Sequence, residues 1–128
     1  MSFRTPKARV VGLGTAHGGT HHWWQMRLSS IALIPLTVLF AVPFAQALGG
    51  GYEEVRALYS QPFHAIVAAL FLAVNFHHLA QGLQTVIEDY VHDKKWRTGL
   101  LIGNTMANAA LGFAGVFAVL RIAFTTAA

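Results

Sequence analysis

Three long apolar stretches dominate the pattern of this chain, at about residues 28–48, 63–87 and 100–125. Each is long enough to cross the hydrocarbon core of a bilayer as a helix, which takes about 20 residues. Short polar connections separate the stretches, and a polar segment over residues 1–27 precedes them. We therefore predict a membrane region of three helices over residues 28–128, preceded by a tail, with no room for a separate soluble domain.

Composition strengthens this interpretation. The 128 residues are 55% hydrophobic and 11% charged, with a mean hydropathy of +0.49, whereas soluble domains are about a quarter charged. The chain has no cysteine, which excludes thiolate-held iron–sulfur clusters and c-type haem attachment within it. The formal net charge of +4 belongs to residues that flank the apolar stretches, so no nucleic-acid partner is expected. The predicted fold class is an all-α membrane protein.

The basic residues are distributed unevenly around the predicted helices. Seven precede the first stretch or fill the second connection: Arg4, Lys7, Arg9, Arg27, Lys94, Lys95 and Arg97. The opposite side has only Arg56 and Arg121. Because cytoplasmic loops are enriched in Lys and Arg, the tail and the loop over residues 88–99 are predicted to face the cytoplasm. The expected location is the bacterial inner membrane, or the mitochondrial inner membrane in a eukaryote.

Polar and small residues recur along the second stretch. At alternating steps of four and three lie His64, Ala68, Phe71, Asn75, His78, Gly82, Thr85 and Asp89. A second polar stripe beside it consists of His77, Gln81, Gln84 and Glu88. Residues so spaced share a face of a helix, and polar groups in a membrane helix face protein, a cofactor or water. The second helix is therefore expected to have partners on several sides.

His78 is the candidate metal ligand of this helix. A neutral imidazole can ligate haem iron, and Gly82, one turn along, removes a side chain where a flat porphyrin needs space. The alternative is that His78 only hydrogen-bonds a neighbouring helix; the adjacent His77 is weakly disfavoured. The other two stretches contain no histidine, and His64 lies about 21 Å along the same helix. A second axial ligand would therefore come from another chain.

Two spaced motifs carry a family resemblance: His78-x₃-Gly82-x₆-Asp89-Tyr90 and His21-x₅-Arg27. They resemble the smaller, D-type hydrophobic membrane anchor subunits of succinate dehydrogenase (respiratory complex II). The segment over residues 12–27 resembles the bacterial, alphaproteobacterial form of that family. The resemblance covers nearly all of the chain, and its weakest part is the third helix.

The resemblance implies two cofactor sites. His78 would be an axial ligand of haem b, with the second ligand supplied by a companion cytochrome b556 anchor subunit. Tyr90 would hydrogen-bond ubiquinone; its alternative is an ordinary aromatic residue at the membrane interface.

Three further residues are expected near these sites. Asp89 would lie beside the quinone, where pairing with Arg27 or Lys94 is favoured over proton relay. Arg27 is a candidate for binding a haem propionate or lining the quinone pocket, since guanidinium suits carboxylates; its alternative is a positive-inside anchor. The resemblance places His21 in the same propionate region.

The function implied is that of a membrane anchor subunit of succinate:quinone oxidoreductase, within a heteromeric helix bundle. Its partners would be the cytochrome b556, iron–sulfur and flavoprotein subunits together with membrane lipid. The complex would carry electrons from succinate, in the tricarboxylic acid cycle, into electron transport. This chain would be a subunit of an enzyme with no catalytic residue of its own. The alternative is a haem-free structural or transport subunit.

Small residues in the third stretch indicate a close-packed surface. They are Gly103, Ala107, Asn108, Gly112, Ala114 and Gly115. Small residues let membrane helices approach closely, and the simplest expected partner is the companion anchor subunit.

Overall fold

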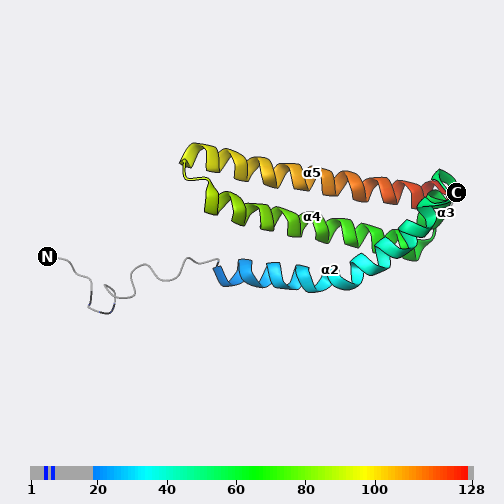
Figure 1. The fold of residues 1–128 in the computed structure, drawn as a ribbon, viewed down its shortest axis with the longest axis horizontal. Coiled ribbons are helices and arrows are strands. Elements are labelled where there is room, and N and C mark those ends of the chain that lie inside the picture. The colour runs from blue at the N-terminus through cyan, green and yellow to red at the C-terminus, as the bar shows by residue number, and fades with distance from the viewer. Residues whose placement is uncertain (1–4, 6, 8–18, 127–128) are drawn as a thin grey trace.

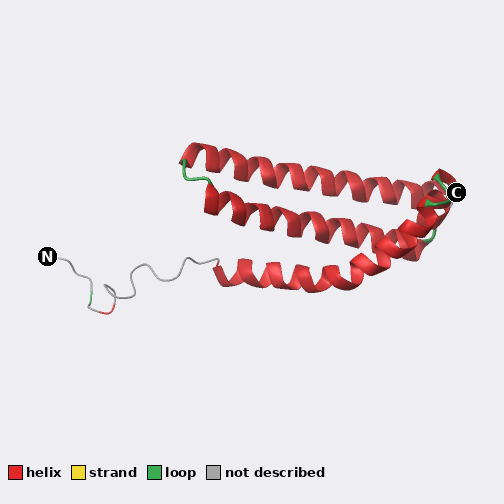
Figure 2. Ribbon diagram, viewed as in Figure 1, coloured by secondary structure: helices red, strands yellow, loops and turns green. Residues whose placement is uncertain are grey.

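The computed structural model describes residues 5, 7 and 19–126 of the chain. Its helices are α2 (Gly19–Leu48), α3 (Tyr52–Ser60), α4 (Pro62–Tyr90) and α5 (Lys94–Thr126). Figure 2 shows these helices with only short connections between them, and no strand occurs among the described residues. α4 is central, because its backbone lies close to both α2 and α5, whereas the backbones of α2 and α5 do not approach each other over the described part of the chain.

Three helices are long and apolar enough to cross a membrane: Thr20–Leu48, Pro62–Tyr90 and Lys94–Thr125. The prediction of an all-helical membrane protein is confirmed, and the protein is a multi-pass membrane protein. α2 begins at Gly19, inside the segment predicted as a tail; residues 1–4, 6 and 8–18 of that tail lie outside the described residues. Large side chains such as Phe113, at 76% exposure, remain uncovered, which suits contact with lipid or other chains.

The connection between α2 and α4 contains a helix that the sequence pattern does not reveal. Gly51 precedes α3 with a φ of 86°, a left-handed conformation that glycine adopts without steric cost. Pro62 then occupies the first turn of α4, where a missing N–H does no harm. A helix of nine residues is marginal by itself, so α3 depends on its packing against the longer helices.

That packing forms an aromatic core at the α3 end of the bundle. Tyr59 is 6% exposed and lies among buried Ala68 and Val119. Phe40 of α2 stacks on Phe71 of α4, with ring centroids 4.4 Å apart. α2 bends on its way to this end in Figure 1, and it contains two prolines, a common cause of helix kinks. Burial raises the pKa of the Tyr59 hydroxyl.

α5 packs along α4 through two of its glycines. A Cβ on Gly112 would lie 3.1 Å from Cβ of Phe76, and one on Gly115 would lie 3.2 Å from Cδ1 of Leu72. Gly103 faces open space, with nothing within 4 Å. The expectation that this small-residue surface packs on a companion chain is therefore wrong for Gly112 and Gly115, because α4 of the same chain already occupies it.

A hydrogen bond from Asn104 joins α5 to α4, and Asn108 lies one turn further along α5. Asn104 Nδ2 donates to the backbone oxygen of Ala80, 2.8 Å away. Asn108, which is 6% exposed, donates to the backbone and side-chain oxygens of Asn104 at 2.9 and 2.8 Å. Buried amides need such partners in an apolar surrounding. The bond from Asn104 to Ala80 is directional and crosses between the helices, so it restricts which face of α5 packs on α4.

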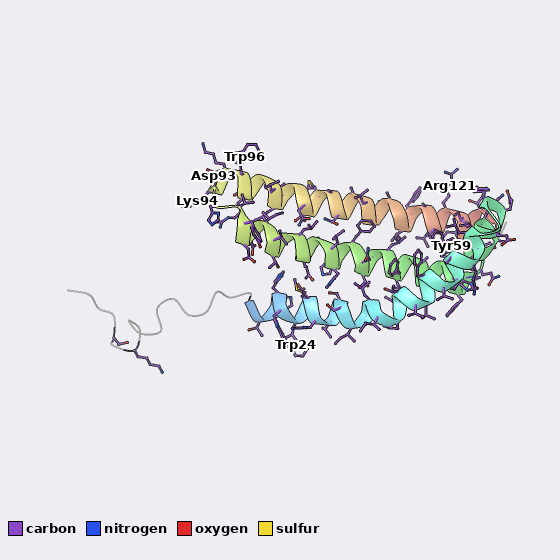
Figure 3. The ribbon with its side chains drawn as sticks, in the orientation of Figure 1. Trp24, Tyr59, Asp93, Lys94, Trp96 and Arg121 are labelled. Carbon is purple, nitrogen blue, oxygen red and sulfur yellow. The ribbon has the colours of Figure 1, made fainter. Side chains whose placement is uncertain are left out.

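The two ends of the bundle differ in charge. The start of α2, the end of α4 and the start of α5 lie together at one end (Figure 1). Figure 3 shows Lys94 and Trp96 at this end and Arg121 at the other. Arg27 and the basic residues over 94–97 thus share an end, as the charge pattern requires; which side of a membrane this end faces stays a prediction.

Candidate functional site

His78 is held by a contact between α4 and α2. Its Nδ1 lies 2.8 Å from Oγ of Ser29, a side chain that is only 8% exposed. His78 itself is half-buried, and its Nε2 makes no hydrogen bond to any described residue. One ring nitrogen is therefore tied to the neighbouring helix, while the other remains available to a ligand.

Gly82 leaves room on the next turn of α4. A Cβ built at this position would meet no atom within 4 Å. Glycine inside a helix is unfavourable by about 1 kcal/mol relative to alanine, and no positive φ at Gly82 requires it here. Gly82 follows His78 by four residues, so its open space lies one turn along the same face of α4, where a planar group such as haem would need room.

His77 points in a different direction from His78. Its exposed side chain lines a groove of about 370 Å³ between α4 and α5, together with Thr105 and Asn108. His77 is therefore on the α5 side of the helix, whereas the hydrogen bond of His78 is on the α2 side. The structure separates two neighbours that the sequence distinguished only weakly.

A second polar contact joins α2 and α4 one turn from His78. Gln81 is 6% exposed, and its Nε2 donates to Oε1 of Gln25 at 3.3 Å. Gln25 Nε2 lies 3.0 Å from Nε2 of His21. The exposed His21 is thus connected through Gln25 to Gln81, which is buried in the interface between α2 and α4. The Oε1 atom of Gln81 is buried and has no hydrogen-bond partner in the described part of the chain.

Asp89 and Tyr90 form the exposed end of α4. Tyr90 is 78% exposed, so this chain does not enclose its hydroxyl. Asp89 makes no ion pair with any described residue, so the pairing with Arg27 or Lys94 stays a prediction. Arg27 is exposed and instead lies over the ring of Trp23, with Cζ 5.5 Å from the centroid.

Sequence reasoning missed Ser29, Gln25 and Asp93. Asp93 caps α5: its Oδ1 accepts from the backbone N–H groups of Lys95 and Trp96, both at 3.0 Å. An Asp directly before a helix is a recognised signal for a helix start, so this cap could have been predicted from the sequence. The other two depend on how α2 and α4 align, which no pattern within one helix gives.

The described residues contain no group of three or more His, Cys, Asp or Glu that could hold a metal ion. A metal bound at His78 would therefore receive one ligand from this part of the chain. His78 and Ser29 lie in the half of the bundle that carries Arg27, His21 and Tyr90, but no hydrogen bond among the described residues joins His78 to these three.

Comparison with known proteins identifies the family of the chain. Residues 1–124 match the family model for the succinate dehydrogenase/fumarate reductase transmembrane subunit. The succinate dehydrogenase hydrophobic membrane anchor subunit of Paracoccus denitrificans is 36% identical over 122 residues, covering 95% of this chain and 94% of the relative. The protein of the same name from Rickettsia bellii is 29% identical over 103 residues, covering 78% and 80%.

The succinate dehydrogenase membrane anchor subunit of Reclinomonas americana is 26% identical over 82 residues, covering 62% of this chain and 68% of the relative. No solved structure matches the chain. The family match extends over nearly the whole chain, and all three relatives are described as membrane anchor subunits of succinate dehydrogenase. The chain belongs to the succinate dehydrogenase/fumarate reductase transmembrane subunit family, with the hydrophobic membrane anchor subunits of succinate dehydrogenase among its relatives.

Proposed function

We propose that this chain is the membrane anchor subunit of a succinate:quinone oxidoreductase, in which His78 is one axial ligand of haem b and Tyr90 belongs to the ubiquinone site. Family membership supports the anchor role. The observation that carries the haem assignment is the imidazole of His78, which is tied through Nδ1 to Ser29 and has Nε2 available, with open space at Gly82 one turn along α4.

The second axial ligand comes from a companion cytochrome b556 subunit. His64 hydrogen-bonds Gln61 at the start of α4, about 21 Å along the axis from His78, so one haem cannot bind both histidines. Within the complex, the flavoprotein and iron–sulfur subunits oxidise succinate and deliver the electrons. Haem b, when bound, supplies one-electron exchange; the role of this chain is to bind and orient.

The quinone site lies at the end of the bundle where α4 terminates. A phenol donates a hydrogen bond to a carbonyl oxygen and suits the membrane interface, and Tyr90 offers its hydroxyl there at 78% exposure. Neighbouring subunits are needed to close a pocket around it. Arg27 and His21 lie at the same end and complete the polar surroundings, with Asp89 next to the pocket.

The proposed orientation puts this end of the bundle on the cytoplasmic side of a bacterial inner membrane. The basic residues gathered there support it, since positively charged segments stay in the cytoplasm. In that orientation the quinone site faces the two soluble subunits, which shortens the electron path to the quinone.

A reduced-minus-oxidised optical spectrum of the purified complex tests the proposal. His78→Ala is expected to abolish the b-type absorption, whereas His77→Ala, on the opposite side of α4, is expected to retain it. An unchanged band in His78→Ala would reject the ligand assignment. A wild-type complex without a b-type band would instead favour the haem-free structural subunit.

A further inference from the structure

We propose that Ser29 is a positioning residue for His78: its hydroxyl oxygen accepts a hydrogen bond from the Nδ1–H of His78 and thereby leaves Nε2 with a free lone pair for iron. This inference rests on the proposed function, because it concerns how the haem ligand is prepared. It assigns a part in the haem site to α2, a helix that contributes no ligand.

The direction of the hydrogen bond follows from the second contact of Ser29. Its Oγ also lies 3.0 Å from the backbone oxygen of Met26, and a carbonyl oxygen only accepts. A hydroxyl has one hydrogen, so with that hydrogen directed at Met26 the oxygen can only accept from Nδ1 of His78 at 2.8 Å. Ligation through Nε2 requires the same tautomer, because a neutral imidazole carries its one proton on the other nitrogen.

The hydrogen bond between Ser29 and His78 lies in a buried, apolar part of the interface, where its loss would not be compensated by water. Ser29 is 8% exposed, and an unpaired N–H in an apolar interior is unfavourable. Rotation of an imidazole about its terminal torsion is broad, so a single directional partner decides which way the ring faces. His77, which no described residue holds in this way, shows that the arrangement is specific to position 78.

Removing the Ser29 hydroxyl should change the redox potential of the bound haem iron as well as the orientation of the His78 ring. A hydrogen bond from Nδ1–H makes the imidazole a stronger donor, and a stronger donor favours ferric over ferrous iron. Loss of the bond is therefore expected to shift the haem midpoint potential to a more positive value. Partners of this kind typically contribute about 10- to 100-fold to metal affinity, so haem should also dissociate about tenfold faster.

The chain contains a matched control one residue away. Ser30 Oγ donates to the same carbonyl oxygen of Met26 at 2.8 Å but does not touch His78. Ser29→Ala and Ser30→Ala therefore lose the same type of bond to α2, and only the first loses the contact with the imidazole. Ser29→Thr keeps a hydroxyl at the position and is the expected rescue.

The experiment uses the complete purified complex of each variant. Optical redox titration gives the haem midpoint potential, and electron paramagnetic resonance of the oxidised haem reports the ligand field. We expect a positive shift and altered resonance in Ser29→Ala, with Ser30→Ala and Ser29→Thr at the wild-type values. If Ser29→Ala does not assemble, Ser29→Cys replaces it, since a thiol fills similar space and accepts hydrogen bonds weakly.

Two results would overturn the inference and can be told apart. If Ser29→Ala or Ser29→Cys retains the wild-type potential and resonance while His78→Ala loses haem, the ligand stands and Ser29 has no positioning role. If His78→Ala retains its haem, the ligand assignment fails and the role of Ser29 falls with it. A shift of equal size in Ser30→Ala would attribute the effect to α2 itself, which also counts against the proposal.

Discussion

Replacing Gly112 by alanine would insert a methyl group 3.1 Å from Cβ of Phe76, at the contact between α5 and α4. The Cβ of Phe76 is fixed to its backbone, so the two helices must separate to admit the methyl group. Overpacking of this kind costs about 1–3 kcal/mol, while alanine is favoured over glycine in a helix by about 0.5–1 kcal/mol. A net destabilisation of about 1 kcal/mol is expected.

Two other glycines of α5 provide graded controls. At Gly115 the close atom is Cδ1 of Leu72 at 3.2 Å, the end of a flexible side chain that can rotate away, so Gly115→Ala should cost less. At Gly103 nothing lies within 4 Å. Gly103→Ala should therefore be neutral, or stabilising by up to about 1 kcal/mol.

The assay is the fraction of purified complex that stays assembled after heating, measured by size-exclusion chromatography. If the two anchor subunits melt as a unit of roughly 150–250 residues, 1 kcal/mol corresponds to a shift of about 2–4 °C. The expected order of midpoints is Gly103→Ala highest, then Gly115→Ala, then Gly112→Ala. The packing described for α4 and α5 would be refuted if the thermal midpoint of Gly112→Ala equalled that of the wild type. It would also be refuted if Gly103→Ala lowered the midpoint as much as Gly112→Ala does.

Two further predictions concern the end of the bundle that carries the proposed quinone site. Tyr90→Phe should lower quinone reduction about 2- to 10-fold, as for the loss of one hydrogen bond, with succinate-driven reduction of a soluble dye intact. Tyr52→Phe, at a similarly exposed tyrosine of α3, should leave both activities unchanged, and equal loss of both activities in Tyr90→Phe would count against the quinone role. Asp93→Ala should destabilise the start of α5 by about 1 kcal/mol, seen as a lower thermal midpoint, while Asp93→Asn should retain most of the stability. A midpoint unaltered by Asp93→Ala would show that the cap contributes nothing.

The membrane helices could be predicted from the sequence because apolar length alone determines them. α3 was not predicted, because nine residues are too few to be stable as an isolated helix. Its stability depends on the burial of Tyr59 in a core formed by α2, α4 and α5. Gly112 and Gly115 were recognised as packing residues, but their partner was misassigned. Small residues indicate that another helix packs closely, but they do not identify which helix it is.

The candidate site shows the same limit. His78 and Gly82 could be singled out from their spacing within one helix. The bond from His78 to Ser29 spans 49 residues of sequence and depends on the alignment of two helices, which no periodicity encodes. Asp89 and Arg27 lie at the same end of the bundle, but both side chains are exposed and Arg27 lies over the ring of Trp23.

The three-residue link between α4 and α5 bears on the order in which the subunit matures. Membrane helices can insert first and associate afterwards, and near neighbours in sequence meet most readily. α4 and α5 can thus form a hairpin as soon as both are inserted, whereas α2 must close across α3. Until α2 packs against α4, His78 has no hydrogen bond to Ser29 to orient its ring. On the proposal above, haem binding would therefore follow the docking of α2, a helix that contributes no ligand to the iron.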